Sequence, residues 1–345
     1  MIQSEYSKQY LVDLDSVMPT LIEYYVAFYG EKYRAMIEQK LRETVFVFCN
    51  GLEEEPFEPE GRVLPEDFNP MLTETTQSFI TPFLEGLDQE DVRNISKQIQ
   101  VSGLVSNSGS ARTYFANDKD GQMRRFVCFV INDNTFDHVL IHELTHIIES
   151  AVIEQDNIQV NSSGLVWFGK NIDSIRRPEF YSKPAAGLYE RHFNEVLTEY
   201  KAYLISSKFH EDGNVIFRPA LPEDKFDLAY RNSWFVMEPM LKMLLPYANN
   251  AVLEQNKQSL IKVFEGEDNY YDFIRALYEL DSQRTMTWVS EQLKGSKVDI
   301  KSGQDVFNNL DKLKKYAKKC DYVRNMLKLI DCTNFVEENI KNQQL

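Results

Sequence analysis

Histidine, cysteine and positive charge are all scarce in this chain of 345 residues. It holds 5 histidines and 4 cysteines, and 38 Lys and Arg residues stand against 53 Asp and Glu residues, so the formal net charge is −15. A field of that sign repels phosphate backbones and anionic lipids. We therefore expect neither nucleic acid nor a membrane surface as a partner.

The cysteines are scattered and form no CxxC pair, which argues against a disulfide framework and against a cysteine zinc site. We expect buried free thiols at Cys49, Cys128, Cys320 and Cys332. No apolar run approaches the roughly 20 residues that span a bilayer, and no basic start precedes an apolar stretch. These features predict a cytoplasmic protein. A toxin or effector exported by a dedicated machine would show the same features.

The remaining sequence has no repeat and no low-complexity tract, and 43% hydrophobic residues are ample for a folded core. Helical spacing and β-branched or aromatic runs predict a predominantly helical α+β fold. The expected elements before the histidine-rich stretch are two helices in residues 14–50, a surface loop at 51–70, helix to about residue 100, and a β-hairpin formed by ARTYFA and MRRFVCFVI. After that stretch we expect a hairpin or a pair of short strands in 157–171, a helix over about 188–207, and mostly helix over 224–340.

Three of the five histidines lie in one stretch, HVLIHELTHIIES, which begins at His138. His142 and His146 are separated by one helical turn, so both imidazoles can reach one metal ion. Glu143 is rotated by about 100° from His142 and can reach a water on that ion. A stripe of Phe136, Leu140, Leu144, Ile147 and Ala151 suits a core. The alternative is a polar helix face with hydrogen-bonded histidines, and we expect that role for His138.

A zinc ion held by two histidines needs a third protein ligand. Neither a glycine nor a third histidine follows the HExxH pattern at the spacing of HExxHxxGxxH. An acidic residue on a second helix is the other common solution, and RHFNEVLTEYKAYLIS supplies Glu195 and Glu199 one turn apart on one face. We do not expect Glu149 to be a ligand.

At these residues the chain resembles the gluzincin zinc metallopeptidases, the superfamily of thermolysin. HELTH matches the active-helix motif of thermolysin, and NEVLTE is similar to the NExx(S/T)(D/E) motif of the superfamily. The resemblance implies that His142, His146 and Glu195 bind one Zn²⁺ and that Glu143 is the general base. It also implies that Glu199 orients a ligand histidine.

The resemblance covers well under a third of the chain, and two features depart from thermolysin. Thermolysin has Asp where this chain has Glu199, and the 48 residues between His146 and Glu195 form a longer gap than its own. The resemblance further implies that one strand before the active helix pairs with extended substrate. Candidates for a donor to the oxyanion stay open: Tyr181, His192, His210, Tyr230 and Arg231.

The sequence as a whole predicts a zinc-dependent endopeptidase that acts on peptide or protein substrates. Two alternatives remain: a catalytically silent zincin-fold protein that binds partners through its helical flanks, and a zinc hydrolase of a non-peptide amide. The expected organisation is a helical region at 1–100, a zincin-like core at 101–215 and a helical region at 216–345. A small mixed or antiparallel sheet should pack on the HExxH helix, with a cleft between the helical lobes.

Overall fold

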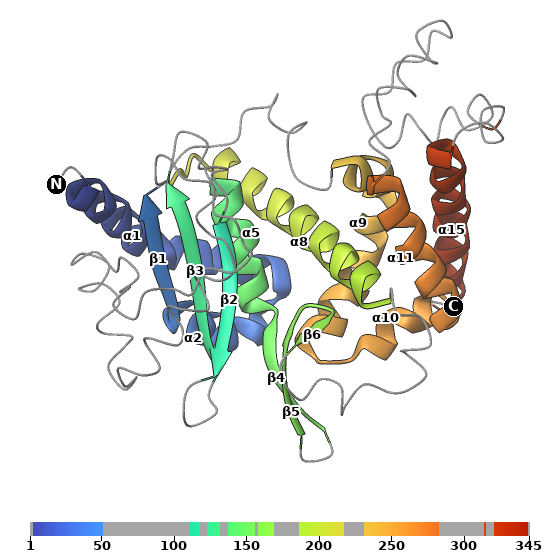
Figure 1. The fold of residues 1–345 in the computed structure, drawn as a ribbon, viewed down its shortest axis with the longest axis horizontal. Helices are drawn as coiled ribbons and strands as arrows, with labels where there is room; N and C mark the ends of the chain where they lie inside the picture. The colour runs from blue at the N-terminus through green and yellow to red at the C-terminus, as the bar shows by residue number, and fades with distance from the viewer. Residues whose placement is uncertain are drawn as a thin grey trace, which may run out of the picture. The chain divides into compact units, whose positions relative to one another are not determined.

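The computed structural model describes residues 3–50, 111–117, 123–131, 137–155, 158–168, 186–216, 231–282, 314 and 321–343 (Figure 1). Contacts divide the chain into two compact units. The first comprises Met1–Ser150 and Lys201–Leu221, and the second comprises Ala151–Tyr200 and Pro222–Leu345. The division falls inside one long helix, α8 (Ala186–Glu211), which therefore supplies residues to both units.

The first unit contains a three-stranded sheet with the strand order β1-β3-β2. β1 runs parallel to β3, whereas β2 and β3 are antiparallel, so the predicted hairpin is confirmed. In the described sheet, β2 pairs with β3 alone and forms an edge. The elements of this unit are α1 (Gln3–Tyr29), η1 (Glu31–Tyr33), α2 (Arg34–Arg42), β1 (Thr44–Asn50), β2 (Ala111–Asn117), β3 (Met123–Ile131), α5 (Asp137–Ile148) and the end of α8.

The prediction of helix up to residue 50 was wrong for the last seven residues, which form β1. TVFVFCN is a run of β-branched and aromatic residues, and such residues favour a pleated, half-buried surface. Val45 and Phe48 match the helical spacing of the preceding segment only by coincidence. They pair with Phe126 and Phe129 of β3 in the sheet.

Helix α5 lies in the core of the first unit, where it contacts α2, β2 and β3. The three stripe residues that lie within α5, Leu140, Leu144 and Ile147, are each at 0% exposure. The opposite, polar side, which carries His138, His142, Thr145 and His146, is also buried. Figure 1 shows α5 beside the sheet formed by β1, β3 and β2. The burial of both faces fixes the helix in place and makes each of its polar groups depend on a partner.

The second unit begins with a small sheet of order β4-β5-β6 and continues as helices. The β5–β6 pair is antiparallel, which confirms the predicted hairpin in residues 157–171, whereas β4 was not predicted. The elements are β4 (Ser150–Gln155), β5 (Ile158–Ser163), β6 (Val166–Phe168), the start of α8, α9 (Arg231–Leu253), α10 (Lys257–Val263), α11 (Glu267–Ser282) and α15 (Asp321–Gln343).

Aromatic packing holds the first part of α8 against α11 within the second unit. The ring of Phe193 lies 5.3 Å from that of Phe273 in an edge-to-face arrangement, and both side chains are buried. The ring of Phe264 packs on Phe273 at 5.1 Å. Such pairs contribute about 0.5–1.5 kcal/mol beyond their buried area. This cluster fixes the segment of α8 that carries Glu195.

The structure confirms the predicted class, a predominantly helical α+β fold with a small mixed sheet against the HExxH helix. The helix predicted over 188–207 is α8. The expected loop at 51–70 and the expected helix to residue 100 fall outside the described residues. The division at residues 100 and 215 stays a prediction. None of the described helices has the length and apolar character needed to cross a membrane.

Candidate metal centre

Both ends of helix α5 are held by hydrogen bonds from other elements. At its start, the buried carboxylate of Asp137 accepts a hydrogen bond from the backbone N–H of Ile216 at 2.9 Å and pairs with His210 Nε2 at 3.0 Å. At its end, Lys40 Nζ donates to the carbonyl oxygens of Ile148 at 2.6 Å and Ser150 at 2.5 Å. The acid at the start complements the helix dipole. At the end, the Lys40 amino group provides a donor for carbonyl oxygens.

His142 and His146 direct their Nε2 atoms at the same point. The two atoms are 3.2 Å apart, and the rings lie edge to face with 4.9 Å between centroids. Two nitrogens bound at 2.0–2.1 Å to one tetrahedral zinc ion are separated by about 3.3 Å. The observed separation of 3.2 Å is close to this value.

Glu195 on α8 completes a group that could hold a metal ion. The ligand atoms of His142, His146 and Glu195 all lie within 4.8 Å of one another. Both histidines are largely buried, while Glu195 is partly exposed. Two imidazoles and one carboxylate are a donor set typical of zinc with an open position for water. The residues present thus fit the ion that the sequence predicts.

Glu143 lies on α5 between the two histidines and is 7% exposed. The Thr113 hydroxyl of β2 donates to Glu143 Oε2 at 2.6 Å and lies 3.1 Å from the Glu143 backbone oxygen. A buried carboxylate needs such a donor, because an unpaired charge in the interior is costly. The sequence analysis missed Thr113, since nothing in ARTYFA indicates which strand residue meets α5.

Of the other polar residues singled out in the sequence, His138 lies on α5, and His192, Glu199 and His210 lie on α8. Arg231 begins α9, and Tyr181 and Tyr230 fall outside the described residues. His138 Nδ1 is 3.3 Å from Ser206 Oγ, which agrees with a local hydrogen-bonding role at the helix start. His210, a candidate for the oxyanion donor, instead bonds to Asp137 at the opposite end of α5 from His146. Glu199 is buried at 4% exposure, one turn after Glu195. Its orienting role stays a prediction.

A buried ion pair follows the histidines on α5. Glu149 Oε1 accepts hydrogen bonds from the Lys201 ammonium group of α8 and, at 2.7 Å, from the Tyr29 hydroxyl of α1. The side chains of Glu149 and Lys201 are each 1% exposed. Glu149 therefore bonds to two other helices, α8 and α1. Lys201 was missed, because a lysine in a half-apolar helix ordinarily extends into water.

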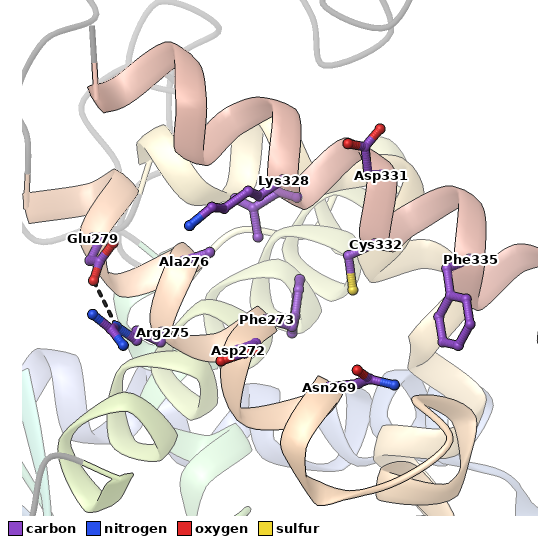
Figure 2. A pocket seen from close by; sticks show the side chains of 11 residues that line it. Asn269, Asp272, Phe273, Arg275, Ala276, Glu279, Lys328, Asp331, Cys332 and Phe335 are labelled. Carbon is purple, nitrogen blue, oxygen red and sulfur yellow. Dashed lines mark hydrogen bonds and ion pairs between the residues drawn. The ribbon is translucent and has the colours of Figure 1, made fainter. Parts of the chain in front are cut away.

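A pocket of about 470 Å³ lies between α11 and α15 of the second unit (Figure 2). Its lining combines both charges with aromatic rings and one thiol, and Arg275 is paired with Glu279. Burial raises the pKa of Cys332 to about 12, so the thiol stays protonated at neutral pH and is a poor nucleophile. The thiol in this pocket is therefore not an activated nucleophile.

No known family, curated protein or solved structure matches this chain significantly.

Proposed function

We propose that this chain is a zinc-dependent endopeptidase. The observation that carries the proposal is the grouping of His142, His146 and Glu195, with the histidine nitrogens separated as zinc requires. When bound, zinc would lower the pKa of a coordinated water and polarise a carbonyl group. One ion is expected per chain.

Glu143 supplies the proton transfer in this proposal. Its carboxylate is on the same helix as both histidines and is held by Thr113, so it is oriented before substrate binds. As general base it takes a proton from the attacking water, and as general acid it returns a proton to the leaving amine. Glu199, buried one turn beyond Glu195, is proposed to orient a ligand histidine.

The edge strand β2 favours a peptide as the substrate. β2 pairs with β3 alone in the described sheet, and its Thr113 contacts the proposed general base. An edge strand can pair with an extended peptide through main-chain hydrogen bonds, which grip a chain without requiring particular side chains. A small non-peptide amide would gain nothing from this edge. We propose a cytoplasmic location, in line with the scattered cysteines of the sequence, which form no CxxC pair.

The test compares the wild type with Glu143→Gln on a broad library of peptides, with zinc measured in both. We expect cleavage by the wild type and a loss of at least about 100-fold in the variant, with one zinc ion per chain retained in each. Full activity of Glu143→Gln would refute the proposed base. Bound zinc without cleavage by the wild type would instead favour a silent scaffold or a non-peptide substrate.

A further inference from the structure

The contact between Thr113 and Glu143 joins the edge strand to the proposed general base. Thr113 Oγ1 lies 2.6 Å from Glu143 Oε2 and 3.1 Å from the Glu143 carbonyl oxygen. A threonine hydroxyl carries one proton and can donate it to one of these oxygens at a time. The shorter distance and the negative charge both favour the carboxylate, because charge-assisted hydrogen bonds are shorter and stronger.

A hydrogen bond to one carboxylate oxygen also determines what the other can do. Thr113 donates to Oε2, which leaves Oε1 as the second acceptor oxygen of the carboxylate. A glutamate side chain loses substantial rotamer freedom when it is ordered. A group that must receive a proton needs its accepting oxygen held in place before the reaction begins. The Thr113 hydroxyl supplies that restraint from β2, an element that carries none of the proposed metal ligands.

We propose that Thr113 is a positioning residue that holds Glu143 with one carboxylate oxygen directed to the reacting water. This inference rests on the proposed function, since it concerns the same site. Thr113 touches no reacting atom in this scheme and acts through Glu143. The hydroxyl is the functional part of the side chain, so serine should replace threonine, whereas valine, which has the same shape without the donor, should not.

The test uses zinc-loaded protein and acetohydroxamate as the probe, which requires no knowledge of the substrate. This small ligand chelates zinc through its two oxygens and can donate a hydrogen bond to an adjacent carboxylate. Calorimetry should show binding weakened about tenfold in Thr113→Val, the cost of a misplaced charged hydrogen-bond partner. Thr113→Ser should stay within about threefold of the wild type, because it keeps the donor.

A double-mutant cycle separates positioning from a general structural role. In a Glu143→Gln background, Thr113→Val should change acetohydroxamate affinity by less than about twofold, because the group it positions is gone. An equal loss in both backgrounds, or no loss in the single variant, would overturn the inference. Thermal unfolding of the zinc-free variants checks that all are folded.

Crystals of the zinc-free proteins provide a readout that does not depend on metal binding. The Glu143 carboxylate should keep its position in Thr113→Ser and move in Thr113→Val. An unmoved carboxylate in Thr113→Val would contradict the inference. A wild type that binds no zinc would refute the proposed function instead, so the two failures are distinguishable.

Discussion

Lys201 and Glu149 form an ion pair in which each side chain is only 1% exposed. Glu149 directly follows the last residue of α5, and Lys201 lies six residues after Glu195 on α8. The Tyr29 hydroxyl donates a second hydrogen bond to the same carboxylate oxygen. Burying two charges is costly, so each partner depends on the other.

Removal of one member of this pair should destabilise the protein strongly. Lys201→Met keeps most of the side-chain volume and leaves Glu149 charged and buried, with Tyr29 as its remaining donor among the described residues. We expect a loss of about 3–5 kcal/mol in the free energy of unfolding, measured by urea denaturation.

A matched control is available on the same helix. Lys208 pairs with Asp212, but its side chain is 59% exposed. Lys208→Met should change stability little, because exposed pairs are solvated and screened. Equal effects of the two substitutions would show that the buried pair contributes no more to stability than the exposed pair.

Gly164 should not tolerate a side chain. Its φ is +58°, and a Cβ atom there would lie 1.9 Å from Asn194 Oδ1, which accepts a hydrogen bond from Leu165 N at 2.8 Å. Gly164→Ala should cost about 1–2 kcal/mol for the backbone and about 1–3 kcal/mol more for the displaced Asn194. Gly213 has φ +81° with open space around it, so Gly213→Ala should show the backbone cost alone in thermal unfolding. Equal melting temperatures for the two variants would contradict this account.

Lys40 should make stability depend on pH. Desolvation by burial, reinforced by Arg125 and opposed by Glu149, lowers the pKa of Lys40 to about 7 in the folded protein. Its unfolded value is near 10.5, so between these values the unfolded state binds more protons, and stability should rise with pH. Below pH 7 the ammonium is charged in both states and this slope vanishes.

The measurement compares urea denaturation of the wild type and Lys40→Met at pH 7 and pH 9. The variant also loses the hydrogen bonds to Ile148 and Ser150, so it should be less stable at both values. The difference between the two proteins should widen towards pH 9. A constant difference would mean that the pKa of Lys40 is not lowered.

Zinc should stabilise the folded protein by mass action. A ligand that binds only the native state at 100 times its dissociation constant adds about 2.7 kcal/mol. Thermal unfolding with added zinc and with a chelator should therefore differ in the wild type. The double variant His142→Ala/His146→Ala removes two of the three proposed ligands and should unfold at the same temperature in both conditions. An undiminished zinc effect in that variant would place binding elsewhere.

The helix that carries the histidines could be predicted from the sequence because its signal is local. The spacing of His142 and His146 indicates one face of a helix, and the same periodicity places Leu140 and Leu144 in the core. Glu195 could be selected because a second acidic pair lies at helical spacing in a separate segment. These inferences need only the geometry of an isolated helix.

The parts that were missed depend on tertiary packing. Residues 44–50 were assigned to a helix, because a short apolar run fits both the helical and the strand period. The residues of β3 with which they pair lie about 80 positions further along the chain. Thr113 and Lys201 gain their roles from the register of one element against another. No local pattern distinguishes Lys201 from the exposed Lys208 seven residues later.

The central claim is that one zinc ion binds to His142, His146 and Glu195. Anomalous diffraction at the zinc edge, from crystals grown with zinc, tests it most directly. We predict a single strong peak within about 2.0–2.2 Å of the Nε2 atoms of both histidines and a carboxylate oxygen of Glu195. A peak held by other residues, or no peak between the two imidazoles, would contradict the account.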